Sequence, residues 1–241
     1  MKKIFFACLL IAGILFIPSF YSCNKDDVNG SDSIHIYTVP TEVAAEYIAL
    51  AFADASGGVN MNLENAAFFA IGTGSIDTSF VISVKDTNKT ITYTRNIDYN
   101  GSIQSNPRRF NFIYTSSGNF YAKVMASSGD QHGNYSFTSL DTITNPLIVN
   151  GSGGDNGKQI SSVFKVSFTS NISYTLKDVR VDKKSLMIKD GTAIVHIEGL
   201  GPASVSFAYS GTITFSGNRK AILVLNNNTY NMNLETGALG K

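Results

Sequence analysis

The sequence predicts a mainly β protein, an antiparallel, meander-like and hairpin-rich sandwich or barrel-like domain with one helix near its N-terminus. The 241 residues include 27 Ser, 19 Thr and 22 Asn, which favour strands, turns and caps over helix interiors. From residue 66 onward apolar and polar residues mostly alternate, which is the period of a strand with one buried face. Short turn segments separate these runs, and they favour antiparallel hairpins because a parallel pair needs a crossover of about a dozen residues.

Composition narrows the class further. Hydrophobic residues make up 43% of the chain, charged residues 15%, and the formal net charge is +1. This balance excludes a disordered polyelectrolyte, a collagen-like rod and a coiled coil. A nearly neutral chain also gives no electrostatic reason to expect nucleic acid as a partner.

The first 22 residues have the pattern of a secretory signal peptide. Lys2 and Lys3 precede an apolar run at 4–17, which Pro18 follows. As a helix, these 14 residues would reach about 21 Å, short of the roughly 30 Å hydrocarbon core of a membrane. We therefore expect residues 1–22 to be removed. The alternative, an uncleaved anchor that runs on through Tyr21, would place Pro18 inside the helix, where proline is costly.

The end of this leader resembles the lipobox of bacterial lipoproteins. Residues 20–23 read Phe-Tyr-Ser-Cys, and in a lipobox a small residue precedes a cysteine that is acylated and becomes the new N-terminus. Ser22 fits this pattern, whereas Phe20 and Tyr21 depart from the usual Leu and small residue, as the looser lipoboxes of Bacteroidota do. The resemblance implies that Cys23 carries fatty acids such as palmitate and holds the chain on a membrane. The only other cysteine is Cys8 in the leader, so the mature chain would have no internal disulfide.

A short acidic segment follows the cysteine. Lys25, Asp26 and Asp27 lie in a sequence that resembles the export signal by which Bacteroidota send lipoproteins to the outer face of the outer membrane. The resemblance implies that the domain lies on the cell surface. Residues 23–33 are almost entirely polar, and we expect them to form a flexible tether.

Residues 34–237 are expected to form a β-rich domain that begins with the helix. The alternating segment 33–38 can form a first short strand. The helix is predicted over 41–55, because Thr41 can cap it, Glu42 suits its positive end and apolar residues recur at helical spacing. Two consecutive glycines at 57–58 are expected to end it.

The rest of the domain is predicted as strands. Each predicted run is rich in β-branched or aromatic residues and is bounded by turn residues. The runs lie at 80–85, 90–97, 110–114, 120–125, 163–168, 173–179, 193–197, 205–209, 212–215, 221–225 and 230–234.

The glycine-rich segment 151–157 divides these strands into two comparable parts. We expect it to be the most flexible stretch, either a domain linker or one long hairpin loop, and therefore a possible subdivision of the domain. One β domain is preferred over two because neither part repeats the other. The segment 204–233 resembles hairpins of Bacteroidota lipoproteins, some of which resemble calycin-type barrels.

Few residues suggest chemistry. His196 and Glu198 share one face of a predicted strand, which would suit acid–base chemistry, but a cross-strand polar pair is the favoured interpretation. His132 is expected in a solvated turn. The segment 199–204 begins like a dinucleotide-binding loop, but Pro202 removes a backbone donor and a strand follows where a helix is required, so we expect a turn.

Metal and cofactor sites are not predicted. Asp155 and Asn156 could offer oxygen atoms to Ca²⁺, but one carboxylate falls short of the several oxygen ligands that this ion takes. The chain has no nucleophile elbow, zinc-binding helix, EF-hand loop or phosphate-binding loop. We therefore assign no catalytic residue, no metal ligand and no cofactor.

Two triplets resemble the acceptor of protein O-glycosylation in Bacteroidota. Each has the order Asp, then Ser or Thr, then an aliphatic residue. The resemblance makes Ser33 and Thr142 candidate glycosylation sites.

Three functions remain open at this point. The favoured hypothesis is a non-catalytic binding or interaction module for a glycan, a small apolar ligand or a neighbouring envelope protein. The first alternative is a fimbrillin-like structural subunit, whose sheet edge or groove would accept a donor strand. The second alternative is a hydrolase of a surface polymer.

Overall fold

The computed structural model describes residues 38–85, 91–141 and 144–240. Residues 36–241 form one compact unit with its own core, so this part of the chain can be studied as a domain. The leader at 1–22, most of the expected first strand at 33–38, and several single-residue assignments lie outside the described residues. These assignments concern Cys23, Lys25, Asp26, Asp27, Ser33 and Thr142, and they stay predictions.

The domain begins with two helices where the sequence predicts one. Helix α1 spans Thr41–Phe52, a 3-10 turn follows at Asp54–Ser56, and helix α2 spans Val59–Ile71. The prediction of a single helix over 41–55 is therefore wrong, because the first helix ends earlier and a second helix follows it. Gly57 makes the break, because it has a φ of 71°, a left-handed conformation that glycine adopts without strain.

The start of α1 also differs from the prediction. Thr41 is the first helical residue, whereas Pro40 holds the N-cap position and no side chain caps the helix. Helix α2 is not predicted from the sequence, because three asparagines interrupt the apolar pattern of its first turns. Its buried apolar residues nevertheless recur three or four positions apart, at Leu63, Ala66, Ala67 and Ala70.

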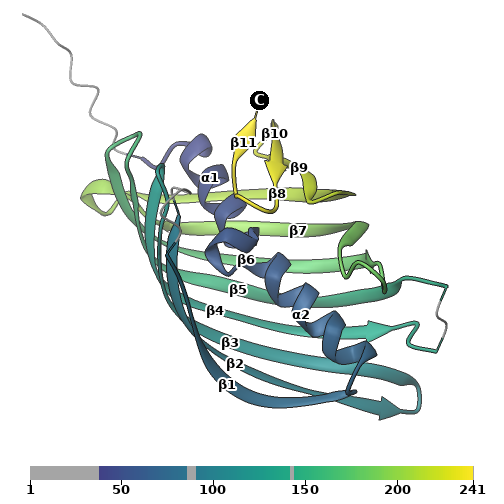
Figure 1. Cartoon of the computed structure of the whole chain (residues 1–241). Helices are drawn as coiled ribbons and strands as arrows, with labels where there is room; N and C mark the ends of the chain where they lie inside the picture. The colour runs from purple at the N-terminus through teal and green to yellow at the C-terminus, as the bar shows by residue number, and fades with distance from the viewer. Residues whose placement is uncertain (1–37, 86–90, 142–143, 241) are drawn as a thin grey trace, which may run out of the picture. The chain divides into compact units, whose positions relative to one another are not determined.

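A single sheet of 11 antiparallel strands forms the rest of the domain, and the strand order follows the sequence order (Figure 1). The prediction of a mainly β, antiparallel meander is confirmed. Within the described residues, the first and last strands do not pair with each other, so the sheet stays open. The strands are β1 (Ser75–Lys85), β2 (Thr92–Ser105), β3 (Arg108–Tyr121), β4 (Met125–Thr138), β5 (Leu147–Ser161), β6 (Val166–Val181), β7 (Ile188–Leu200), β8 (Ser206–Gly217), β9 (Lys220–Leu225), β10 (Asn228–Asn233) and β11 (Leu239–Gly240).

Most strands are longer than the sequence pattern indicates, and the clearest difference is the glycine-rich segment. Residues 151–157 form the middle of β5 and pair with β4 and β6, so the loop or linker prediction is wrong. The glycines there leave room for large side chains on the neighbouring strands. A Cβ atom on Gly153, for example, would lie 2.2 Å from the hydroxyl oxygen of Tyr174.

The core lies between the helices and the face of the sheet that curves around them (Figure 1). Nine of the twelve residues of α1 are buried. Its Phe52 ring packs edge-on against Tyr174, with 5.2 Å between the ring centroids. Helix α1 contacts β9 and β10, whereas α2 contacts β1 and β3. The helices therefore link the early strands to the late strands inside the open sheet.

Buried polar groups fix α1 on the sheet. The Tyr47 hydroxyl donates a hydrogen bond to Asp155 Oδ1 at 2.5 Å, and Gln131 Nε2 donates to Asp155 Oδ2 at 2.6 Å. Burial raises the pKa of the Asp155 carboxyl and that of the Tyr47 hydroxyl. Arg95 Nε donates to the carbonyl oxygen of Ser56 at 2.8 Å, which holds the 3-10 turn on β2. These contacts set the depth and rotation of α1.

Gly133 tests how tightly the aromatic core is packed. A Cβ atom there would lie 2.3 Å from the Tyr114 ring and 2.6 Å from the Tyr135 ring, both of which are buried. We expect Gly133→Ala to lower the free energy of unfolding by about 1–3 kcal/mol, because an overpacked core must shift its neighbours. Urea denaturation measures this change.

Gly240→Ala is the matched control for that variant. The nearest atom to its added Cβ is 3.9 Å away, so its free energy of unfolding should stay within about 0.5 kcal/mol of the parent. Equal stability of the two variants would show that the tyrosine rings can move aside without cost.

Candidate functional site

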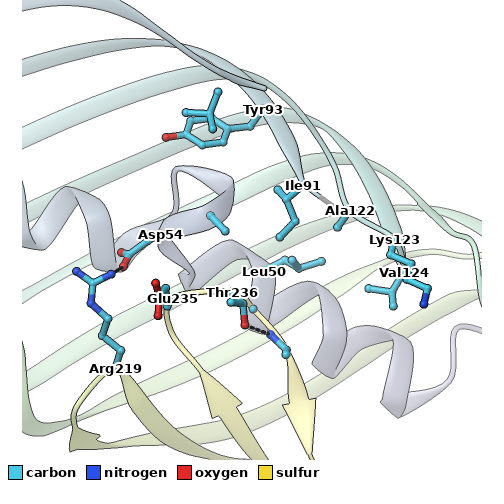
Figure 2. A pocket seen from close by; sticks show the side chains of 14 residues that line it. Leu50, Asp54, Ile91, Tyr93, Ala122, Lys123, Val124, Arg219, Glu235 and Thr236 are labelled. Atoms are coloured by element: carbon cyan, nitrogen blue, oxygen red, sulfur yellow. Dashed lines mark hydrogen bonds and ion pairs between the residues drawn. The ribbon is translucent and has the colours of Figure 1, made fainter. Parts of the chain in front are cut away.

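A cleft of about 700 Å³ lies between the hairpin ends of the early strands and the turns of the late strands (Figure 2). Its walls come from the end of α1 and the following 3-10 turn, the hairpin ends of β1 and β2, and the turns after β3, β8 and β10. The residues that line it are Leu50, Asp54, Ala55, Val84, Ile91, Tyr93, Ala122, Lys123, Val124, Arg219, Glu235, Thr236, Gly237 and Ala238. The cleft therefore depends on segments that are up to 188 residues apart in the sequence.

One wall of the cleft is apolar. Leu50 projects from α1, Ile91 precedes β2, and Val124 lies in the turn between β3 and β4. Ile91 and Val124 are only partly buried and pack against the main core. In Figure 2, Ile91, Ala122 and Val124 lie across the cleft from Asp54 and Arg219. The wall therefore offers apolar surface that the domain itself does not cover.

The opposite wall is held by a polar cluster. Arg219, in the turn between β8 and β9, pairs with Asp54 at 2.5 Å and with Glu64 of α2 at 3.2 Å. Asn60 Nδ2 donates to both carboxylates, at 2.6 Å to Asp54 and 3.2 Å to Glu64. The cluster thereby ties the late part of the sheet to the 3-10 turn and to α2.

Burial dominates the electrostatics of this cluster. It raises the pKa of Glu64 to about 7, and the nearby charge of Asp54 adds to the effect, although Arg219 and Asn60 act in the other direction. Burial also raises the pKa of Asp54, against the influence of Asn60 and Arg219. Only 17% of the Asp54 side chain and 19% of the Glu64 side chain are exposed, so water screens the two carboxylates poorly.

Two charged groups of the lining are not used by this cluster. Glu235, in the loop between β10 and β11, and Lys123, in the turn between β3 and β4, form no side-chain hydrogen bond or ion pair with any described residue. These two charges can interact with a ligand, whereas Arg219 is already paired with two carboxylates.

His196 and Glu198 lie on the exposed face of β7, away from this cleft. Their side chains approach to 3.5 Å between Nε2 and Oε2, and His196 Nδ1 lies 2.9 Å from the Ser210 hydroxyl on β8. The favoured interpretation, a cross-strand polar pair, is met by His196 and Ser210, whereas Glu198 lies on the same strand as His196. His132 was expected in a turn, but it lies within β4 and its side chain is exposed, so that prediction is wrong.

Asp155 is not a loop ligand for Ca²⁺. It lies inside β5, is 4% exposed and accepts hydrogen bonds from Tyr47 and Gln131 in the core. Among residues 38–85, 91–141 and 144–240, no three His, Cys, Asp or Glu side chains come close enough to hold a metal ion. The expected turn is shorter than 199–204, because Gly199 and Leu200 still belong to β7, and it contains a 3-10 helix at Pro202–Ser204. None of the helices described has the length and apolar character needed to span a membrane.

Sequence reasoning does not find the cleft, because no local motif marks it. Its lining residues come from the end of α1, from strand ends and from turns, and these parts are far apart in the sequence. The one usable signal is the pair Asp54 and Glu64, two carboxylates on either side of the glycine pair 57–58. Their partner, Arg219, is 155 residues away from Glu64 and cannot be assigned without the fold.

The raised pKa of Glu64 leads to a pH prediction. A folded carboxyl group with a pKa above its unfolded value binds protons more readily in the folded state, so the free energy of unfolding falls as pH rises from about 4.5 to about 7. Asp54 contributes in the same direction. In Glu64→Gln, the free energy of unfolding should decrease less between pH 5 and pH 8 than in the parent, by roughly 1–2 kcal/mol. Urea denaturation at several pH values measures both slopes, and identical slopes would contradict the assignment.

The comparisons with known proteins identify no relative of this chain. A scan against protein-family models finds no matching family, and searches of curated proteins and of solved structures find no match. The function is therefore inferred from the geometry of the cleft and from the N-terminal sequence.

Proposed function

We propose that the domain binds a small, largely apolar molecule in the cleft, as a non-catalytic binding module. The observation that carries this proposal is a cleft of about 700 Å³ that combines an apolar wall with two unpaired charges. Ligand sites in proteins commonly measure about 300–1,000 Å³ and are lined by apolar side chains with a few polar groups that orient the ligand. Both the size and the lining of this cleft match that description.

The apolar wall is the main source of affinity in this proposal. Each Å² of apolar surface that a ligand covers contributes about 25 cal/mol. Ile91, Val84 and Val124 present such surface to the cleft, whereas Leu50 is 2% exposed and contributes little. Glu235 and Lys123 can then hold polar groups of the ligand. A molecule with an apolar body and a polar group at one or both ends fits this arrangement.

The walls of the cleft are fixed before a ligand arrives. Arg219, Asn60 and two carboxylates lock the β8–β9 turn to the helices, while Arg95 holds the 3-10 turn on β2. A preformed site binds more tightly because little conformational freedom is lost on binding. This rigidity supports a binding role for the cleft. The alternative is that the cleft is only a gap left by the open sheet.

The proposed location of the module rests on the N-terminal sequence. Cys23 would carry the acyl chains, Lys25, Asp26 and Asp27 would direct the protein to the outer face of the outer membrane, and the polar residues up to 33 would form the tether. Several acyl chains hold a protein stably on a membrane, because each buried CH₂ contributes about 0.8 kcal/mol. The module would then collect its ligand outside the cell.

The neutral apolar dye N-phenyl-1-naphthylamine tests the cleft, because its fluorescence rises in apolar surroundings. We expect the parent domain to bind the dye and Val124→Asp to weaken binding about ten-fold, since a carboxylate then replaces part of the apolar wall. Val163→Asp is the matched control. Val163 is 57% exposed and lies outside the cleft, so this variant should bind the dye like the parent. Equal loss in both variants, or no binding to the parent, would contradict the proposal.

The anchor is tested separately by labelling cells with palmitate. We expect the label on the parent protein and on Cys8→Ser, because Cys8 lies in the removed leader. Cys23→Ser should lose the label and leave the membrane fraction, because the chain after the leader has no second cysteine to carry acyl chains. Retention of the label by this variant would disprove the assigned anchor.

A further inference from the structure

Strand β1 is the long edge of the sheet that the structure describes, and Figure 1 shows it at the side opposite to β8–β11. It has 11 residues and, among the described residues, pairs only with β2, in one continuous register without a bulge. The other edge is protected in the usual way, because β10 has six residues and β11 has two. An 11-residue edge leaves a row of backbone N–H and C=O groups that another strand can pair with.

The side chains of β1 indicate what that other strand is. Its centre is apolar, with Phe80, Val81 and Ile82 in sequence, and Val81 is 65% exposed. The strand has two charged residues, Asp77 and Lys85, which lie on the same face as Val81 and at equal distances from it along the strand. Neither charge forms an ion pair with any described residue.

We propose that β1 pairs antiparallel with β1 of a second copy of this chain, with Val81 on the two-fold axis. In this register Asp77 lies opposite Lys85 of the second copy, and the symmetry repeats the pair on the other side of the axis. Ser79 then lies opposite Ser83, and Phe80 lies opposite Ile82. Oppositely charged residues that face each other across a strand pair stabilise it.

The charges select this register over its neighbours. In an antiparallel pair related by a two-fold axis perpendicular to the sheet, opposite residues must point to the same face. One β1 strand can therefore shift along the other only in steps of two residues. A shift of two residues in one direction places Asp77 opposite Ser83, and the charged pairs are lost. The register centred on Val81 is therefore the one that matches both charges and brings the apolar centres together.

This pairing predicts an assembly of two copies. A two-fold interface uses the same patch on both copies and closes at the dimer. It covers the long β1 edge of each copy and places the short strands β10 and β11 towards the outer ends. The inference goes beyond the proposed ligand binding and does not rest on it, because β1 pairing involves no ligand.

Charge exchange gives a sharp test by sedimentation equilibrium, with the domain produced from residue 24 onward. Asp77→Lys and Lys85→Asp should each raise the dimer dissociation constant about ten-fold or more, because each variant places like charges opposite each other twice. Mixing the two variants should restore association near the parental level as a heterodimer. The double variant should also associate like the parent.

A second pair of variants keeps the test independent of the charges. Val81→Lys should abolish the dimer because two lysines would meet on the axis, whereas Val224→Lys, at another exposed valine on β9, should leave it intact. Circular dichroism confirms that all variants are folded. A parent domain that stays monomeric at every soluble concentration would overturn the proposal. A dimer that ignores the substitutions in β1 would also overturn it.

Discussion

The structure depends on the burial of α1 against the inner face of an open sheet. A sheet whose first and last strands do not pair cannot fill its own interior, so its buried Phe and Tyr side chains need a second element to pack on. Helix α1 supplies it, with nine of its twelve residues buried. The contact is specific as well as apolar, because the buried carboxylate of Asp155 requires the Tyr47 hydroxyl and the Gln131 amide as partners. One rotation of the helix satisfies all of these groups.

The cleft follows from the way this helix ends. The chain breaks at Gly57 and starts again as α2 towards the early strands, while the late strands turn back at Arg219. The polar cluster around Glu64 joins α2 to the turn between β8 and β9. The proposed ligand site involves the hairpin end of β1, whereas the proposed contact with a second copy involves its free edge.

The sequence predicts the features that depend on local chemistry. Alternating residues indicate the antiparallel strands, and the spacing of Val43, Tyr47 and Ile48 indicates α1, because both patterns report one buried face. The glycine-rich centre of β5 is mispredicted. Its glycines allow neighbouring strands to approach closely, as Gly153 does beside Tyr174, and they do not form a flexible loop. The cleft is missed for the same reason, because Arg219 meets Glu64 only after the sheet has formed. Local sequence patterns do not predict such distant contacts.

The sequential strand order affects how the chain can fold. Every strand pairs with the next one along the chain, so each hairpin can form with little loss of loop entropy. Helix α1 is the exception, because it contacts β9 and β10 near the other end, and the Tyr209 hydroxyl bonds to the carbonyl oxygen of Val39 across 170 residues. A chain that emerges N-terminus first therefore presents its most apolar helix long before the strands that cover it exist. Until β9 and β10 have been synthesised, the apolar surface of that helix stays partly uncovered and open to aggregation.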